Sequence, residues 1–320
     1  MVSRQVVPSV VAMRGLASIE VRRLGKTFGN SVAVDELSFQ VAPGQVTGFV
    51  GPNGAGKSTT MRIILGLDRP TAGEALIAGR PYHSISRPLC QVGALLEANA
   101  VHPGRRGRDH LLWLAQSNGL PSRRVDQVIE QVGLGAAALR RAGGYSRGMC
   151  QRLGLAAALL GDPGVLILDE PVNGLDPEGV RWMRQSLRDW AGQGKAVLVS
   201  SHLIAELEGT ADRLLVIGHG RLLADSSVAE LVGAINASQV DLRTTQRERA
   251  ITALTGAGAQ VTLTGPDSLS IEHLPAERVA QVMATHGLPV LELTSHRATL
   301  EDAYLKLTQG VTQHRSGETS

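Results

Sequence analysis

The sequence has little of what marks several large classes of protein. Its 320 residues contain two cysteines, Cys90 and Cys150, which are too few for a disulfide framework and do not have the CxxC spacing of a zinc site. We therefore expect a reducing, cytoplasmic compartment. No run of 18 consecutive apolar residues occurs, so no segment is predicted to cross a bilayer. The formal net charge is only +3, from which we infer no nucleic-acid partner.

Short apolar runs alternate with amphipathic stretches over residues 17–235, and this pattern predicts an α/β domain. Three of the runs are predicted to be buried parallel strands: Val46–Val50, Val165–Leu168 and Ala196–Val199. Between about residues 97 and 161 no strand pattern occurs, and three helices are predicted instead: Arg108–Asn118, Ser122–Val132 and Arg147–Leu160. A helical insert is therefore expected to interrupt the α/β core.

A smaller pattern follows a predicted linker at Gly233–Ser238. Its expected elements are a strand near Val240, a helix at Gln246–Leu254, strands near Val261 and Leu269, a helix at Ala276–His286 and a strand at Pro289–Leu293. This βαββαβ order is typical of a small ferredoxin-like α+β unit, which we assign to residues 236–308 with a closing helix at Leu300–Leu307. Residues 1–16 are expected to form a loose tail, and residues 309–320 a disordered one.

A glycine-rich segment follows the first predicted strand. It satisfies the pattern GxxxxGK[ST] of a P-loop NTPase and leads into a helix predicted from Lys57 to Leu67. In such a strand-to-helix turn, backbone N–H groups converge on phosphate oxygens and the helix N-terminus adds the positive end of its dipole. Lys57 is expected to reach the β- and γ-phosphates, and Ser58 to ligate Mg²⁺. The predicted nucleotide-binding residues are Gly51, Pro52, Asn53, Gly54, Ala55, Gly56, Lys57, Ser58, Thr59 and Thr60.

Two acidic residues follow the second predicted strand, and a histidine follows the third. Asp169 and Glu170 come at a carboxyl strand end, the edge where ligands of open α/β sheets bind. Asp169 is expected to hold Mg²⁺ directly or through water, and Glu170 to orient and polarise the attacking water. His202 lies 32 residues after Glu170, where a βαβ unit would return it to the same edge. For each segment alone the alternative is structural: a helix N-cap for the acids, a solvated histidine for His202.

The stretch from Tyr145 to Arg152, with the sequence YSRGMCQR, completes a set of five motifs in order. It resembles the signature of the nucleotide-binding domains of ABC transporters, in the variant form of drug and peptide-antibiotic exporters. Asn173–Pro177 resembles the D-loop of this family, and His202 its switch histidine. The resemblance covers about Ile19–Leu231 and implies a P-loop ATPase that uses ATP and Mg²⁺.

The resemblance also implies a homodimer with two ATP molecules between its subunits. In this ATP sandwich, Ser146 and Gly148 of one subunit close over the γ-phosphate that Lys57 of the other holds. The D-loop residue Asp176 is a further predicted nucleotide-binding residue. Phe28 matches the aromatic residue of the family that stacks on adenine. The alternative for Phe28 is a place in the hydrophobic core.

Three departures from the family pattern bear on function. Glu97 stands at the Q-loop position, where most members have glutamine. Since a carboxylate can ligate Mg²⁺ but should repel the γ-phosphate, we expect a catalytic and metal-binding role with altered coupling rather than lost hydrolysis. Arg147 and Met149 replace small or polar signature residues. The basic segment His102–Arg108 is either a solvated loop or part of the surface that docks a permease helix.

The segment Thr294–Lys306 is similar to the end of exporter ATPases of the daunorubicin and bacitracin resistance type, whose permeases are separate ABC-2 membrane proteins. The resemblance thus implies a peripheral subunit on the cytoplasmic face of the cell membrane, which powers export of a drug, antibiotic or lipid-like substrate. The alternative is a soluble or regulatory ABC ATPase that is not coupled to transport. The C-terminal unit either stabilises or regulates the dimer, or packs passively.

Overall fold

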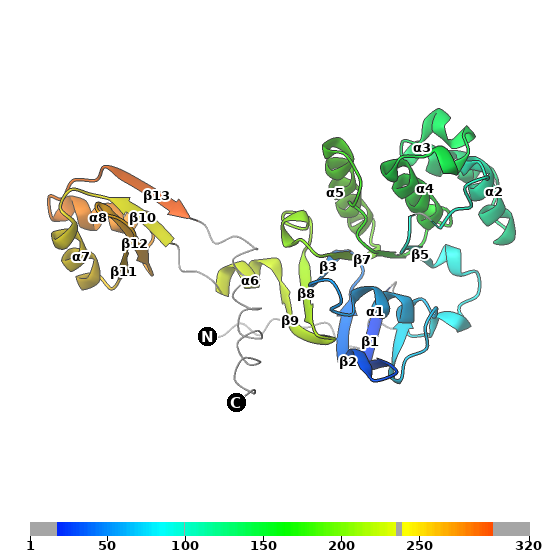
Figure 1. Cartoon of the computed structure of the whole chain (residues 1–320), viewed down its shortest axis with the longest axis horizontal. Coiled ribbons are helices and arrows are strands. Elements are labelled where there is room, and N and C mark those ends of the chain that lie inside the picture. Colours follow the sequence, from blue (N-terminus) through cyan, green and yellow to red (C-terminus); the bar gives the residue numbers. More distant parts are fainter. Residues whose placement is uncertain (1–17, 99, 235–238, 297–320) are drawn as a thin grey trace. The chain divides into compact units, whose positions relative to one another are not determined.

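The computed structural model describes residues 18–98, 100–234 and 239–296. The chain divides into two compact units, and the division falls between Ser227 and Val228 (Figure 1). The predicted tails and the predicted helix at Leu300–Leu307 lie outside the described residues. Within the described ranges, none of the helices combines the length and the apolar character needed to span a bilayer.

The first unit contains nine strands and five α-helices among its described residues. The strands are β1 (Ile19–Phe28), β2 (Ser31–Val41), β3 (Gln45–Val50), β4 (Ala72–Ile77), β5 (Val92–Leu95), β6 (Val165–Leu168), β7 (Ala196–Ser201), β8 (Arg213–Gly218) and β9 (Arg221–Ser227). The helices are α1 (Lys57–Ile64), α2 (Gly107–Ser117), α3 (Arg123–Gln131), α4 (Arg147–Leu159) and α5 (Pro177–Gly192).

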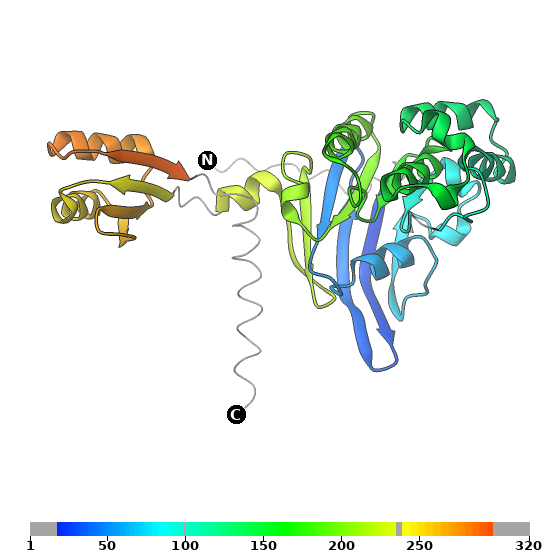
Figure 2. The same cartoon turned by 45° about the horizontal axis from the view of Figure 1, so that its top comes forward.

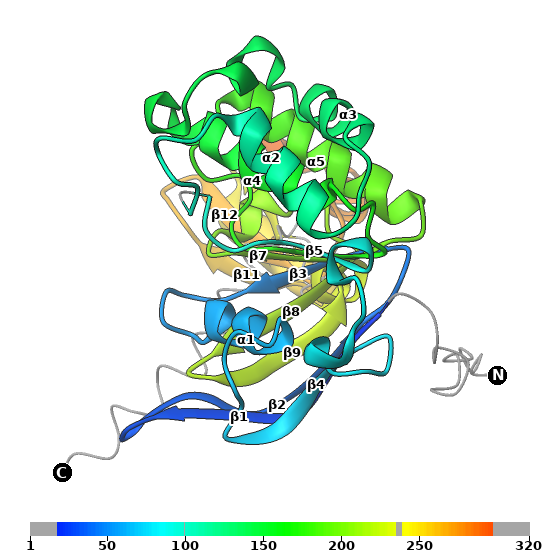
Figure 3. The same ribbon diagram turned by 90° about the vertical axis from the view of Figure 1, so that its right-hand side faces the viewer.

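Two sheets form the frame of this unit. One has the strand order β5-β6-β7-β3-β8-β9, in which only β9 runs antiparallel to its neighbour, and the other is the antiparallel sheet β2-β1-β4. The long hairpin of β1 and β2 is drawn in blue in Figure 2. Figure 3 shows α1 between the two sheets, with α2 to α5 on the opposite side of the parallel strands. The parallel strands therefore have both faces covered, which explains their continuous apolar runs.

Alternating side chains divide the core between the two faces of the parallel sheet. Ile167 and Leu198 belong to the cluster shared with α1 and the antiparallel sheet, where the rings of Phe39 and Phe49 lie 5.4 Å apart. The helical insert between β5 and β6 contains α2, α3 and α4, and the three helices predicted there are confirmed to within one or two residues at each end.

Two predicted elements, the helix at Lys57–Leu67 and the strand at Pro289–Leu293, have ends that the structure places three residues away. Helix α1 ends at Ile64 instead of Leu67, because Gly66 adopts a φ of +66° and its N–H turns back to the carbonyl of Ile63. The last described strand spans Glu292–His296 rather than Pro289–Leu293, because pairing with its neighbour begins opposite Arg243 at Glu292. In both places the type of element was predicted correctly and its bounds were not.

The second unit contains α6 (Val228–Ala234), β10 (Gln239–Arg243), α7 (Arg247–Gly256), β11 (Gln260–Leu263), β12 (Ser268–Glu272), α8 (Ala276–Thr285) and β13 (Glu292–His296). The predicted βαββαβ order is confirmed, but the predicted linker was wrong at Gly233 and Ala234, which belong to α6. The antiparallel sheet has the order β11-β12-β10-β13. Alternate strand residues such as Leu242 and Ile271 form one core with α7 and α8.

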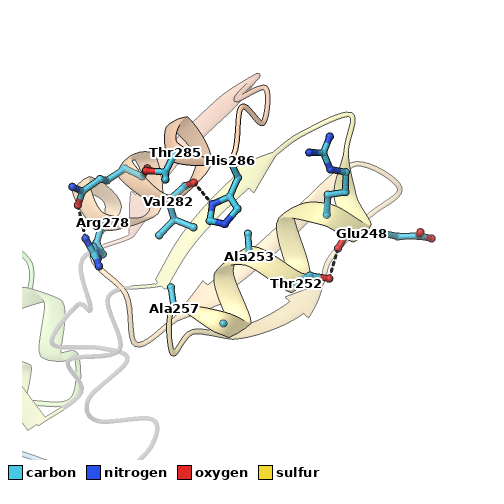
Figure 4. A pocket seen from close by; sticks show the side chains of 11 residues that line it. Glu248, Thr252, Ala253, Ala257, Arg278, Val282, Thr285 and His286 are labelled. Atoms are coloured by element: carbon cyan, nitrogen blue, oxygen red, sulfur yellow. Dashed lines mark hydrogen bonds between the residues drawn. The ribbon is translucent and has the colours of Figure 1, made fainter.

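A groove of about 850 Å³ lies between α7 and α8 of the second unit. Ala253, Ala257 and Val282 line it, and the side chains of Arg278 and His286 extend along its edge (Figure 4). The imidazole Nδ1 of His286, the C-cap residue of α8, lies 2.9 Å from the carbonyl oxygen of Val282 in that helix. None of the predicted nucleotide-binding residues is among those that line this groove.

Candidate functional site

The glycine-rich loop between β3 and α1 has a shape that only glycine permits at two positions. Gly56 has a φ of +103°, and a Cβ atom there would lie 2.5 Å from the carbonyl oxygen of Ala33. A Cβ atom on Gly51 would lie 2.3 Å from the carbonyl oxygen of Ile217. The loop is thus pressed against neighbouring backbone, and the first N–H groups of α1, which have no intrahelical partner, are free to bind an anion.

Lys57 is the first residue of α1 and is only 6% exposed. Its ammonium group donates hydrogen bonds to the carbonyl oxygens of Gly51 (2.6 Å) and Pro52 (3.2 Å). Burial lowers the pKa of Lys57, while the carboxylates of Glu170 and Asp169 raise it in opposition. The cation is therefore held against the loop where phosphate is expected to bind.

The structure brings together Ser58 and Asp169, two of the three predicted metal-binding residues. The hydroxyl of Ser58 on α1 donates to Oδ2 of Asp169 at 2.7 Å, and the hydroxyl of Ser200 donates to the other carboxylate oxygen. The backbone N–H of Asp169 donates to the carbonyl of Leu95 at 2.7 Å. A hydroxyl and a carboxylate are oxygen ligands of the kind that Mg²⁺ prefers, so this donor set fits the ion.

Glu170 has an unusual backbone for a residue with a side chain. Its φ of +47° lies in the left-handed region, at a cost of about 1–3 kcal/mol that persists only where the surroundings impose it. Its N–H donates to the hydroxyl of buried Ser200 at 2.9 Å. Its carbonyl accepts from the side-chain amide of Gln151 and from the N–H of Asn173, both at 3.2 Å. Two strand ends and α4 thus hold this one residue.

The carboxylate of Glu170 is also held on both sides. Oε1 lies 3.0 Å from Nδ1 of His202, and Oε2 accepts from the side-chain amide of Asn173. The expectation that the strand after Glu170 returns His202 to the same sheet edge is therefore confirmed. Sequence reasoning missed Ser200, Gln151 and Asn173. The strand register could have pointed to Ser200, since Leu168 pairs with Val199 and the next residues are Asp169 and Ser200.

The loop that carries His202 is anchored by further polar contacts. The hydroxyl of Ser201 lies 2.5 Å from a carboxylate oxygen of Glu206 and accepts the N–H of Leu203 at 2.9 Å. Arg184 on α5 donates to the carbonyls of Ala205 and Glu206 at 2.9 and 3.1 Å. These bonds tie the loop to α5 and limit the positions that the imidazole can take.

The predicted signature and D-loop residues begin helices. Ser146 is the N-cap of α4 and accepts the N–H of Met149 at 3.2 Å, and Asp176 is the N-cap of α5 and accepts the N–H of Gly179 at 2.9 Å. A Cβ atom on Gly148 would lie 3.1 Å from the carbonyl oxygen of Gly174, so the first turn of α4 packs closely on the segment that precedes α5. Within the described part of the chain, no hydrogen bond joins Ser146 or Asp176 to the glycine-rich loop.

Phe28 and Glu97 are both exposed. The alternative of a core position for Phe28 was wrong, because this residue is 51% exposed. The ammonium group of Lys26 lies over its ring, 4.7 Å from the ring centre. Glu97 lies two residues after the end of β5, and β5 pairs with β6, the strand that directly precedes Asp169. Among the described residues, no hydrogen bond or ion pair joins its side chain to Ser58 or Asp169, so their association stays a prediction.

The basic segment His102–Arg108 is only partly solvated. Arg108 forms an ion pair with Asp126 at 2.9 Å, and the guanidinium of Arg105 lies 5.0 Å from the ring centre of Trp113, which is 53% exposed. Next to this segment is a hollow of about 300 Å³, lined by Ala98, Val101, Pro103, Ala142, Gly143, Tyr145, Cys150 and Leu153. The hollow thus adjoins both Glu97 and the first turn of α4.

Comparison with known proteins places these features in a family. Residues 34–173 match the family model described as ABC transporter, and residues 238–301 match a model described as a domain of unknown function (DUF8746). The chain is 34% identical over 297 residues to the uncharacterized ABC transporter ATP-binding protein YhcH of Bacillus subtilis (strain 168), covering 91% of this chain and 95% of YhcH. It is 32% identical over 302 residues to the bacitracin transport ATP-binding protein BcrA of Bacillus licheniformis, covering 92% of this chain and 98% of BcrA.

A further similar protein is the Nod factor export ATP-binding protein I of Burkholderia pseudomallei (strain 1710b), 34% identical over 300 residues that cover 92% of this chain and 97% of that protein. Among solved structures, an ATP-binding subunit of an ABC transporter aligns with a TM-score of 0.62 and 26% identity over 68% of this chain and 92% of its own. The dimeric bacterial ABC transporter cassette MJ0796 aligns with a TM-score of 0.59 and 22% identity, over 65% of this chain and 98% of its own. At this identity the similarity is one of fold alone.

Proposed function

The chain belongs to the ABC transporter ATP-binding proteins, the ATP-hydrolysing subunits of these transporters, and from this premise we propose that it powers export through a separate permease of the ABC-2 type. Relatives named for bacitracin transport and for Nod factor export are matched over almost their whole length, which supports export and a drug, antibiotic or lipid-like substrate. The chain would then lie at the cytoplasmic face of the membrane, bound through that permease.

The contact between the Glu170 carboxylate and His202, beside the Ser58–Asp169 pair, carries the proposed chemistry. Lys57 and the N–H groups at the start of α1 would bind the β- and γ-phosphates. Ser58 and Asp169 would hold Mg²⁺, which when bound neutralises charge on the phosphate oxygens. Glu170 would accept a hydrogen bond from the attacking water and polarise it, while His202 keeps the carboxylate in place.

Two of the proposed Mg²⁺ ligands, Ser58 and Asp169, lie in contact, and a site with so few protein side chains agrees with how Mg²⁺ is usually held at nucleotide sites. The ion keeps several waters and takes phosphate oxygens, so a full protein cage is not needed. Among the described residues, no group of three or more His, Cys, Asp or Glu side chains is arranged to hold a metal. Glu97, whose side chain is exposed, would be a further ligand.

We propose that two copies form the ATP sandwich. The exposed start of α4, with Ser146 as its N-cap, supports this, because a helix N-terminus favours a phosphate and the turn around Gly148 packs closely on the Gly174 backbone. Asp176 starts α5 next to this turn. Phe28 would stack on adenine from its exposed position at the end of β1.

The proposed domain division is an ATP-binding domain over residues 17–235 and an accessory domain over residues 236–308. The second unit supports a ferredoxin-like assignment through its βαββαβ order and its antiparallel strand order β11-β12-β10-β13. An accessory domain that folds around its own core suits a role in stabilising or regulating the dimer.

We further propose that the small hollow beside Glu97 receives a cytoplasmic segment of the permease. Its lining is mostly apolar and includes Val101, Pro103 and Leu153, and Tyr145, which also lines it, directly precedes the N-cap of α4. A segment bound there would touch the Q-loop and the signature helix at once. Arg105, packed on exposed Trp113, would lie near its rim.

The test uses the variant Glu170→Gln, which we expect to bind MgATP without turnover. Tagged variant protein with MgATP is captured from detergent-solubilised native membranes, with Glu130→Gln as the matched control on the exposed end of α3. A stoichiometric multi-span membrane protein that accompanies Glu170→Gln more strongly than the control would support the proposal. Ribosomal proteins, or no membrane partner, would favour a soluble or regulatory ABC ATPase.

A further inference from the structure

Gln151 is a buried polar residue that the mechanism above does not use. It lies on α4, five residues after the N-cap Ser146, and is 6% exposed. Its side-chain amide nitrogen donates to the carbonyl oxygen of Glu170 at 3.2 Å, across 19 positions of sequence. A buried amide is placed by its hydrogen bond, since leaving the bond unmade is costly. Gln151 therefore links the helical insert to the backbone of the proposed catalytic carboxylate.

The backbone of Glu170 depends on such links more than an ordinary residue does. Its left-handed φ of +47° is unfavourable for a side chain, so neighbouring groups must impose it. Ser200 holds the N–H from β7, Asn173 closes the following turn, and Gln151 supplies the one side-chain donor from α4. Removing that donor would leave the carbonyl of Glu170 tied only to its own turn.

The same helix approaches the Glu170 turn a second time. The first turn of α4 packs on the segment after Asn173: a Cβ atom on Gly174 would lie 2.9 Å from Cβ of Arg147, and one on Gly148 would lie 3.1 Å from the carbonyl of Gly174. Close packing transmits small displacements instead of absorbing them. A movement of α4 must therefore shift the turn that carries the Glu170 carboxylate.

We propose that Gln151 is a positioning residue for ATP hydrolysis, which holds the Glu170 carboxylate in place by tying its carbonyl to the signature helix. The inference rests on the proposed function, in which Ser146 on the same helix engages ATP in the partner copy. In a dimer, the contact of Ser146 with one nucleotide would then be linked through α4 to the carboxylate that acts on the other nucleotide. Gln151 itself touches neither nucleotide, so it should affect the rate and not the binding.

The test compares Gln151→Met, which keeps the length of the side chain and removes the donor, with Gln116→Met on the exposed face of α2. We expect kcat for ATP to fall about 10- to 100-fold in Gln151→Met, because displacement of a catalytic group by about 1 Å costs that much. The KM for ATP and MgATP-induced dimerisation should stay close to wild type, the melting temperature should fall by no more than about 4 °C for the one lost hydrogen bond, and Gln116→Met should match wild type throughout. Gln151→Glu, of the same shape, keeps a donor only while its carboxyl group is protonated, so its kcat should fall as the pH rises and that group ionises.

A purely structural role predicts a different result. It would lower dimerisation, lower the melting temperature by clearly more than about 4 °C and raise KM together with any fall in kcat, and this outcome would overturn the proposal. A kcat within twofold of wild type in Gln151→Met would overturn it as well. If wild-type protein is active and dimerises while Gln151→Met is unimpaired, only this inference fails. If wild-type protein neither dimerises with MgATP nor hydrolyses it, the proposed function fails together with the inference.

Discussion

Replacing Phe28 with alanine should weaken ATP binding without unfolding the protein. Stacking of a base on an aromatic ring contributes about 1–3 kcal/mol, which corresponds to a roughly 5- to 150-fold rise in the Kd for ATP. The ring is 51% exposed, and its one aromatic or cationic neighbour among the described residues is Lys26, at 4.7 Å. An exposed cation–π contact contributes only about 0.5–1 kcal/mol, so its loss adds little.

The exposure of the ring also sets the expected change in stability. Burying a whole phenylalanine side chain contributes about 1.5–3 kcal/mol, so a half-buried ring contributes about 1 kcal/mol. For a domain of this size that loss lowers the melting temperature by about 2–4 °C. A phenylalanine in a closed core would instead cost about 3–5 kcal/mol, or more than about 6 °C.

Calorimetric titration of Phe28→Ala with MgATP and with magnesium tripolyphosphate separates the base from the phosphates. ATP affinity should fall while tripolyphosphate affinity is unchanged, and Phe28→Trp, which keeps a stacking surface, should bind ATP like wild type. Unchanged ATP affinity in Phe28→Ala would refute the reasoning. So would a drop in melting temperature above about 6 °C, because it would assign the ring a core role.

Three further predictions follow from the site. Ser200→Ala removes the hydroxyl that donates to the Asp169 carboxylate and accepts the Glu170 N–H. Urea denaturation should show a free energy of unfolding lower by about 1–3 kcal/mol. An unchanged free energy of unfolding would contradict these two hydrogen bonds. Lys57→Met should abolish ATP binding. Burial lowers the pKa of Lys57 from its ordinary value of 10.5, so between the lowered pKa and pH 10.5 the unfolded chain binds more protons than the folded chain. The stability of wild-type protein should therefore rise relative to that of Lys57→Met as the pH approaches 10.5. The same difference in melting temperature between the two proteins at every pH would contradict this. Glu97→Gln should change kcat by less than about tenfold, since among the described residues no hydrogen bond joins the Glu97 side chain to Ser58 or Asp169. The dependence of kcat on Mg²⁺ concentration should change, because an amide is a weaker Mg²⁺ ligand than a carboxylate. Loss of all turnover would contradict this prediction and make Glu97 essential.

Motifs whose chemistry lies within a short stretch of chain were predictable from the sequence. The glycine-rich loop and the acidic pair at the end of β6 combine local backbone geometry with one or two side chains, so their spacing indicates their place. The return of His202 to Glu170 was also predictable, because a parallel strand that follows a crossover ends at the same sheet edge. The order of elements in both units followed from hydrophobic periodicity in the same way.

Contacts between distant positions were decided only by the tertiary structure. The left-handed backbone of Glu170 is imposed by Ser200 and Gln151, which lie 30 and 19 residues away in the sequence. The end of α1, the register of β13 and the exposure of Phe28 likewise depend on which backbone or side chain happens to lie opposite. Sequence by itself determined the chemical groups and the order in which they occur. The packing of separate elements determined which groups meet, because hydrogen bonds and close contacts act over a few ångströms in space regardless of distance along the chain.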